Sequence, residues 1–210
     1  LTDSGTGTDI TSLTKTAAGQ WNLAGTSNSY TGATTVNDGI LGLNAAGVLP
    51  STSPLALTPT SATSVATLQM SGEFTRSLAA SATAGSGTVT FGYSIASTTG
   101  GVGFAAHSTP LVVAFGGTSS PTALTWGSGG FVGTGGVQNL AFSSTSALSS
   151  VDFRNAINLG ALVRTINVLD NTNTGADFAT MSGVLSGTGG GLLKIGAGIL
   201  RLTGLNSYTG

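Results

Sequence analysis

Short runs in which apolar and polar residues alternate predict β-strands along most of the chain. The clearest runs are rich in β-branched residues and only four to seven residues long, as is typical of strands. They lie at residues 65–70, 88–91, 111–115, 123–126 and 163–169. In the last run, Arg164, Ile166 and Val168 share one face and the intervening residues share the other.

Clusters of Gly, Asn, Asp and Ser separate these runs and supply the positive φ angles that turns require. No longer window shows a persuasive helical period of apolar residues. The best helical candidate, residues 146–159, also divides into two strands at 150–154 and 156–159. The pattern therefore predicts an all-β chain.

Composition narrows the choice of architecture. Gly accounts for 34 of the 210 residues, and Gly, Thr and Ser together make close to half of the chain. Many short strands and turns are typical of sandwiches, barrels and β-solenoids. Small residues favour a solenoid, because stacked coils can enclose a narrow core. With coils of roughly 20–25 residues, we predict a parallel β-helix (β-solenoid) of about nine coils.

The two ends of the chain repeat one another. Asn-Ser-Tyr-Thr-Gly stands at 28–32 and again, 178 residues later, at 206–210. The match extends upstream when one residue is skipped near Thr26, and residues 4–7 resemble 186–189. We therefore predict a single β-solenoid segment over residues 1–210, with the repeated motif at 4–43 and 186–210. The absence of an initiator Met suggests a segment of a longer repetitive protein.

The repeated motif resembles the autotransporter-associated β-strand repeat. Residues 194–210 follow its pattern Lys-x-Gly-x-Gly-x-Leu-x-Leu-x-Gly-x-Asn-x-Tyr-x-Gly, and residues 30–43 carry the continuation Thr-x-Val-x-x-Gly-x-Leu. The first copy departs from the pattern, with Ala17 in the place of Gly196. The resemblance implies a right-handed parallel β-helix on the outside of a bacterium, in a long surface or secreted protein, and it implies no particular ligand.

The motif positions are the residues to which we assign a structural role. They are Gly25, Asn28, Tyr30, Gly32, Gly39, Gly198, Leu200, Leu202, Gly204, Asn206, Tyr208 and Gly210. Leu200 and Leu202 should point the same way along a strand, with Arg201 opposite, and the glycines on either side should form turns. We expect Tyr208 to pack over the adjoining coil and Asn206 to bind turn backbone. An aromatic sugar-stacking patch is the alternative.

The titratable residues form no convincing catalytic or metal-binding motif. The single His107 lies near the turn-like Thr109-Pro110 and is expected in a solvated loop, and no Gly-x-Ser-x-Gly elbow marks a catalytic triad. One His and no Cys are too few for a zinc site. Asp170 and Asp177 are near neighbours and could join a sugar-active carboxylate pair across stacked coils. We predict no catalytic residue, no metal and no cofactor.

Three further patterns are weak. The glycine strings at 133–136 and 187–191 lack the Lys-Ser/Thr of a phosphate loop. Thr-x-Thr pairs at 6–8 and 88–90 suggest an ice-binding face, but they do not recur in every coil. The most apolar stretch, 191–205, is interrupted by Lys194 and Arg201, which argues against a membrane span.

Charge excludes one class of partner. Only 6% of the residues are charged, against about 25% in ordinary domains. Six Lys and Arg residues in a chain of net charge −1 cannot form the basic surface that nucleic-acid binding needs.

We expect a non-enzymatic structural segment of an extracellular β-solenoid, a stalk, fibre or adhesin at the outer surface of a bacterium. Its partners would be neighbouring repeats or identical subunits end to end, with surface glycans as a second class. The alternative function is a carbohydrate-binding or carbohydrate-cleaving surface β-helix.

Overall fold

Strands are the regular elements of the described chain. The computed structural model describes residues 1–4, 9–44, 48–92, 100–133 and 138–210, and within them it contains seventeen strands and no helix. The predictions made for residues 5–8 and 134–136 lie outside the described residues. The candidate helix at 146–159 instead contributes two strands, as the alternation allowed.

The strands are β1 (Leu13–Lys15), β2 (Gln20–Leu23), β3 (Thr34–Val36), β4 (Gly39–Leu43), β5 (Leu55–Leu57), β6 (Val65–Phe74), β7 (Val89–Phe91), β8 (Gly101–Val113), β9 (Leu124–Thr125), β10 (Asn139–Phe142), β11 (Val151–Phe153), β12 (Ile157–Asn158), β13 (Val163–Val168), β14 (Ala179–Met181), β15 (Leu185–Ser186), β16 (Gly191–Ile195) and β17 (Leu200–Leu202).

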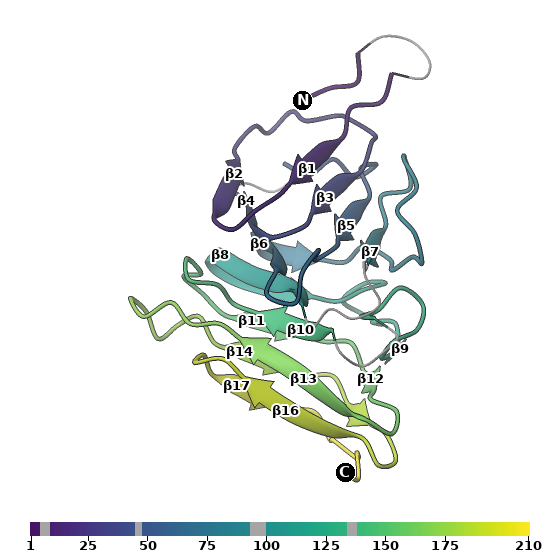
Figure 1. Cartoon of the computed structure of the whole chain (residues 1–210), viewed down its shortest axis with the longest axis vertical. Coiled ribbons are helices and arrows are strands. Elements are labelled where there is room, and N and C mark those ends of the chain that lie inside the picture. Colours follow the sequence, from purple (N-terminus) through teal and green to yellow (C-terminus); the bar gives the residue numbers. More distant parts are fainter. Residues whose placement is uncertain (5–8, 45–47, 93–99, 134–137) are drawn as a thin grey trace.

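These strands stack in parallel columns down the long axis of the molecule (Figure 1). One column is the four-stranded sheet β1-β3-β5-β7, and another is the three-stranded sheet β9-β12-β15. The longest column runs β2-β4-β6-β8-β10-β13-β16, and β11, β14 and β17 extend a second branch from β8. Parallel pairing of successive strands in each column makes the fold a parallel β-helix, as the sequence predicted.

The coils are fewer and longer than predicted. Seven strands stack along the longest column, so the described residues build seven coils and not nine. Paired residues lie 20 positions apart in the first step, from Trp21 to Leu41, and 38 apart from Phe104 to Phe142. Connections such as residues 114–123 lengthen a coil without adding another one.

The core of the middle coils is aromatic, where the sequence suggested a narrow core of small residues. Seven of the eight phenylalanines are buried inside the coils, and they are Phe74, Phe91, Phe104, Phe115, Phe131, Phe142 and Phe153. Neighbouring rings in this group have centroids 5.1 to 6.1 Å apart. Such pairs contribute about 0.5–1.5 kcal/mol each beyond the burial of their area. The longer coils enclose enough space for these rings.

The alternation in β13 follows the prediction. Arg164, Ile166 and Val168 are buried, whereas Val163 is 60% exposed. Burial of Arg164 is the unexpected part. Its Nε donates to the carbonyl oxygen of Leu159 at 2.7 Å, and its guanidinium lies 5.7 Å from the ring centre of Trp126. A cation on an inward position is therefore held by a turn carbonyl and an indole.

Residues 143–149 cover part of the outer face of the longest column. The Ser146 hydroxyl donates to Gln20 Oε1 at 2.6 Å and to Gln69 Oε1 at 2.9 Å. The Ser144 hydroxyl also donates to Gln69 Oε1, at 2.8 Å. This segment of the fifth coil thus binds the first and third coils, and it buries Gln69 although that residue points away from the core.

Candidate stacking interface

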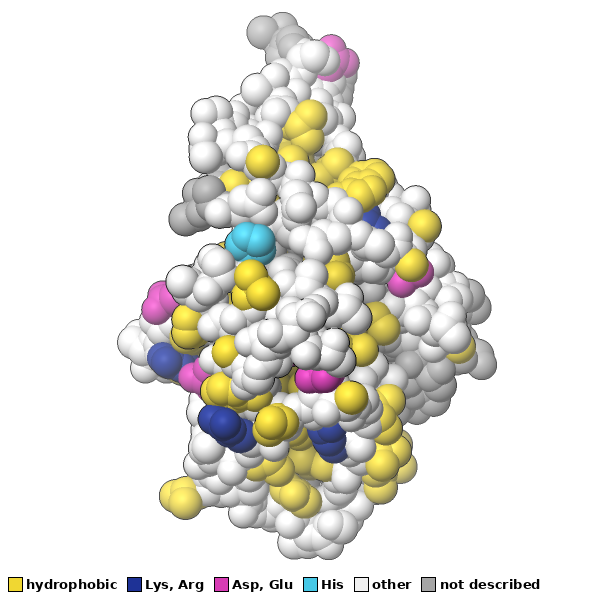
Figure 2. Space-filling model, turned by 90° about the vertical axis from the view of Figure 1, so that its left-hand side faces the viewer, with side chains coloured by type: hydrophobic (Ala, Val, Ile, Leu, Met, Phe, Trp, Pro, Cys, Tyr) yellow, Lys and Arg dark blue, Asp and Glu magenta, His cyan; other side chains and the backbone are white. Residues whose placement is uncertain are grey.

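Each of the chain's six cations has a defined local contact. Four of them donate to backbone carbonyl oxygens, and these are Lys15, Arg76, Arg164 and Lys194. The other two contact side chains: Arg154 pairs with Asp152 at 2.8 Å, and the Arg201 guanidinium lies 3.6 Å from the ring centre of Phe178. Charged side chains are correspondingly sparse on the face shown in Figure 2. The cations therefore serve mainly to hold turns and neighbouring strands.

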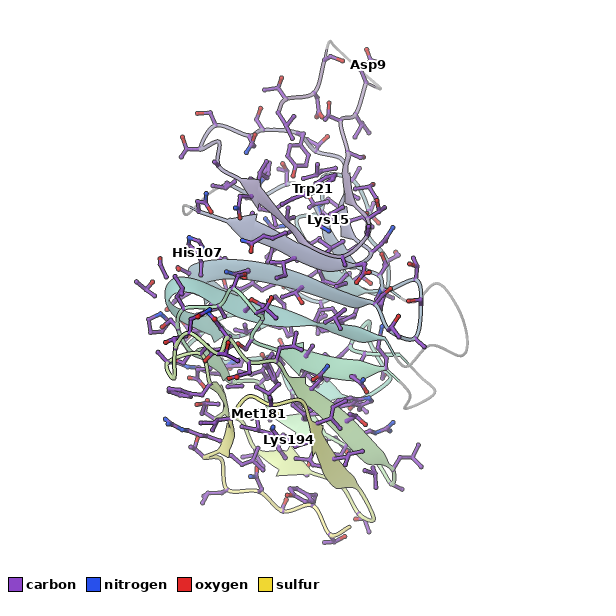
Figure 3. The ribbon with its side chains drawn as sticks, turned by 60° about the vertical axis from the view of Figure 1, so that its left-hand side comes forward. Asp9, Lys15, Trp21, His107, Met181 and Lys194 are labelled. Carbon is purple, nitrogen blue, oxygen red and sulfur yellow. The ribbon has the colours of Figure 1, made fainter. Side chains whose placement is uncertain are left out.

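Lys15 ties the first coil to the second. Its side chain is fully buried, and Nζ donates to the carbonyl oxygens of Thr16 at 3.2 Å, Ala17 at 2.5 Å and Asp38 at 2.9 Å. Asp38 lies one coil further along the stack, before β4. Burial lowers the pKa of Lys15, and the charge of Asp38 acts in the opposite direction. Nζ also lies 5.7 Å from the ring centre of Trp21. Figure 3 labels both residues, in the upper part of the molecule.

Lys194 holds the same motif position in the last coil and makes fewer contacts. Its side chain is exposed, and Nζ donates to the carbonyl oxygen of Gly196 at 2.6 Å. This contact corresponds to the bond from Lys15 to Ala17 within the first coil. Because β16 ends its column, no carbonyl of a following coil is present among the described residues to accept a further bond.

Asn28 and Asn206 show the same difference. In both copies the asparagine Oδ1 accepts a hydrogen bond from the preceding coil. The donor to Asn28 is the nitrogen of Leu1 at 2.6 Å, and the donor to Asn206 is the nitrogen of Leu185 at 2.9 Å. Asn28 Nδ2 also donates to its own turn and, at 3.0 Å, to the carbonyl oxygen of Val48 one coil further on. Within the described residues, Asn206 Nδ2 makes no hydrogen bond. Asn28 thus bridges coils as well as binding its own turn, whereas the side chain of Asn206 binds only Leu185 of the preceding coil.

The two tyrosines differ in burial because, among the described residues, a coil follows the first copy of the motif but not the last. Tyr30 is fully buried, and its hydroxyl lies 2.6 Å from Thr34 Oγ1 in the strand that follows. Tyr208 packs against the core but is only partly buried. Among the described residues, Tyr208 has no following strand equivalent to β3 to cover it.

Backbone hydrogen bonds place the two copies of the motif on equivalent supports. Ser29 N donates to the carbonyl oxygen of Leu1 at 2.9 Å, and Ser207 N donates to that of Leu185 at 2.8 Å. Leu1 therefore occupies the place of Leu185. Ser186 directly follows Leu185, whereas Ser4 lies three residues after Leu1. The structure therefore does not place Ser4 at the position of Ser186, with which the sequence aligned it.

Most motif glycines lie where a side chain would strike the preceding coil. An added Cβ would lie 2.2 to 2.7 Å from a backbone oxygen at five of them, namely Gly32, Gly39, Gly198, Gly204 and Gly210. Real Cβ contacts essentially never fall below 3.0 Å. Gly25 is different, because its nearest neighbour is the Asn28 side chain at 3.5 Å. The glycines thus permit close stacking of coils in addition to forming turns.

The inner side chains of the last coil are left open. Leu200 and Leu202 pair with Ala179 and Met181, whose side chains are buried, while Arg201 lies on the outer side of the strand. Leu202 is nevertheless exposed, and Leu200 is only partly buried. We call the open side of β16, β17 and residues 206–210 the C-terminal end face. It lies at the lower end of the molecule in Figure 1.

The titratable candidates are placed apart from one another or serve local structure. His107 lies in β8 and not in a loop, which corrects the prediction made from Thr109 and Pro110. Asp177 is buried, where its carboxylate accepts bonds from the Ser143 hydroxyl and from Asn171 N. Asp170 takes no part in that cluster. In the described part of the chain, no three His, Asp or Glu residues are grouped to hold a metal ion, and no helix is long and apolar enough to cross a membrane.

The motif pattern alone does not reveal the role of the lysine that opens it. Lys15 and Lys194 stand at the same distance before the two glycine-rich corners, and this shared spacing is the sequence signal for a common role. The structure explains it, because each lysine binds a carbonyl oxygen of its corner.

Comparison with known families agrees with this geometry. Residues 13–43 and 192–210 match the sequence model of the passenger-associated-transport-repeat family. Searches of curated proteins and of solved structures found no significant match. The matched segments are the two places where the motif's lysine, glycine-rich corner and β-strand pair recur, and the resemblance of this chain to autotransporter passenger repeat proteins is thereby confirmed.

Proposed function

We propose that this chain is a non-enzymatic structural segment of a bacterial surface or secreted passenger, and that a further coil of the same kind stacks on its C-terminal end face. The observation that carries the proposal is the pair of lysines. Lys15 donates forward to Asp38 in the next coil, whereas Lys194 has the same local turn and no such acceptor. The free Nδ2 of Asn206 supports the same conclusion, since its counterpart binds Val48.

A further coil would complete the contacts that the last coil lacks. It would supply carbonyl oxygens for Lys194 and Asn206 and would bury Leu202 and Tyr208. A hydrogen bond from a charged donor contributes about 1.5–3 kcal/mol, and one from a neutral donor about 0.5–1.5 kcal/mol. Coils stacked in this way form a stiff rod, because each strand is hydrogen-bonded on both sides. Such a rod suits a stalk or fibre.

An extended chain tests the proposal. Gly210 corresponds to Gly32, so residues 33–92 are appended directly after Gly210. In this chain the added copy of β3 should pair with β16, and the added copy of β4 should pair with β17. We expect slower hydrogen exchange of the β16 and β17 amides and a higher unfolding temperature.

The matched control carries Gly39→Ala in the appended segment only. In the native chain a Cβ at Gly39 would lie 2.4 Å from the carbonyl oxygen of Gly19, and Gly198 takes that place at the end face. The control should therefore lose the gain in protection. Unchanged exchange of β16 and β17 in the extended chain would refute the proposal. Retention on pectin, alginate or peptidoglycan, or release of product from them, would favour the carbohydrate alternative.

A further inference from the structure

The inward face of β13 carries a buried guanidinium that has no carboxylate partner. Arg164, at the start of this strand (Figure 1), is 6% exposed, and the ion pair found among the described residues is that of Arg154 with Asp152. Every Asp and Glu of the sequence lies within the described residues, so none of them pairs with Arg164. A guanidinium keeps its proton in proteins, and burial of an unpaired charge is strongly unfavourable. The core therefore holds an uncompensated positive charge at this point.

Two hydrogen-bond donors near this charge lack an acceptor. Arg164 Nε donates to the carbonyl oxygen of Leu159 at 2.7 Å, but Nη1 is buried and has no hydrogen-bond partner among the described residues. Trp126 is 4% exposed, and its ring centre lies 5.7 Å from the guanidinium. Its Nε1 is also buried and, in the same part of the chain, has no partner. Buried donors without an acceptor incur the full cost of their lost hydration.

The side chains above and below Arg164 do not compensate its charge. The register of β10 on β13 places Gln138 one coil before it, and Leu192 of β16 pairs with it on the other side. Gln138 is buried, and its Oε1 accepts a hydrogen bond from Gly133 N at 2.7 Å. Leu192 contributes an apolar side chain. The interior of the stack thus offers the guanidinium no negative charge in either direction.

Arg76 shows how this chain satisfies a buried guanidinium with its own backbone. Its Nη1 donates to the carbonyl oxygen of Ser53, and its Nη2 donates to those of Pro50 at 2.7 Å and Leu49 at 3.2 Å. Burial lowers the pKa of Arg76 and also that of Arg164. Both terminal nitrogens of Arg76 therefore have acceptors, whereas Nη1 of Arg164 has none among the described residues.

We propose that a small monovalent anion, chloride being the simplest, binds inside the coils to Arg164 Nη1 and Trp126 Nε1. One anion can accept hydrogen bonds from both donors and neutralise the guanidinium, whereas a water molecule leaves the charge in place. The bound ion would link the corner that follows β9 to the first residues of β13. The inference goes beyond the proposed function and does not depend on it, because the site lies within the stack and not at its end face.

Thermal unfolding in a chloride titration is the first test, with sodium gluconate replaced by sodium chloride at constant ionic strength. A ligand that binds the folded state alone raises stability with the logarithm of its concentration above the dissociation constant. At about a hundred times that constant, we expect the unfolding temperature to rise by about 5–10 °C. Arg164→Met should abolish the rise. Arg76→Met is the matched control and should keep it.

Bromide quenching of Trp126 is the second test, and it does not require the Arg164 variant to fold. Trp21→Phe leaves Trp126 as the sole tryptophan. Because Trp126 is buried, collisions with dissolved bromide should quench it little. We expect saturable quenching by bromide at constant ionic strength and recovery of the emission when chloride is added.

The two tests also exclude the other possible acceptor. A water molecule in place of the anion would produce neither the chloride-dependent rise nor the saturable quenching, and that result would overturn the inference. Quenching that chloride does not reverse would overturn it as well. So would a chloride-dependent rise that Arg164→Met and Arg76→Met reduce equally.

Discussion

Replacement of Lys15 by methionine tests whether the buried ammonium holds the first two coils together. Methionine keeps the length of the side chain and removes the three hydrogen bonds to Thr16, Ala17 and Asp38. Each bond from a charged donor contributes about 1.5–3 kcal/mol, and the loss is partly offset because burying an ammonium costs several kcal/mol. We expect a net destabilisation of about 3 kcal/mol, since carbonyls left without a buried donor also incur a desolvation cost.

Lys194→Met is the matched control. It removes one bond of the same kind at an exposed site, where solvent screening limits its contribution to about 0–1 kcal/mol. A loss of 3 kcal/mol should lower the unfolding temperature by roughly 6–12 °C in a chain of this size. The assay is thermal unfolding followed by circular dichroism, together with hydrogen exchange of Asn37 and Ile40, whose amides donate to the first coil. Equal effects of the two substitutions would refute the role assigned to Lys15.

Three further predictions concern single positions. Gly196→Ala should destabilise the last coil by at least about 1–2 kcal/mol from left-handed strain alone, with more from the overlap with the preceding coil; unchanged hydrogen exchange of β16 would contradict this. The Asp3 carboxylate accepts bonds from Thr11 and Thr31, which lower its pKa below the ordinary 3.8. These bonds should therefore be fully present above pH 3.8 and be lost as the pH falls through the lowered pKa; an NMR titration in which the Thr31 amide responds identically in the Asp3→Asn variant would refute the assignment. Asn155→Ala removes a buried side chain bonded to Phe115 N and to two carbonyls, so it should cost about 2–3 kcal/mol in denaturant unfolding; a loss below about 0.5 kcal/mol would contradict it.

The strands and their inward faces could be predicted because alternation is a local property. Arg164, Ile166 and Val168 turn inward together, as their spacing requires. The number of coils could not be predicted in the same way. It depends on how many residues each connection holds. Gly116-Gly117 marks a turn within residues 114–123, but a turn signal does not tell whether a connection closes a coil or only lengthens it. The assumed coil length of roughly 20–25 residues was too short for the middle of the chain.

The interface could be located from the sequence but not explained by it. The repeated Asn-Ser-Tyr-Thr-Gly string marked both sites, yet the asymmetry between Asn28 and Asn206 depends on which coils lie next to them.

The two copies of the motif occupy different faces of the solenoid, and this determines how a continued stack would be arranged. β1 belongs to the four-stranded sheet, whereas its counterpart β16 ends the longest column. β2 begins that column, whereas its counterpart β17 ends the second branch. The 178 residues between the copies therefore do not complete a whole number of coils. If the chain continues after Gly210 as it does after Gly32, each following unit is turned by one face. Covering segments such as 143–149 would then fall on successive faces of the rod, so a long array would distribute its surface loops around the axis and not along one side.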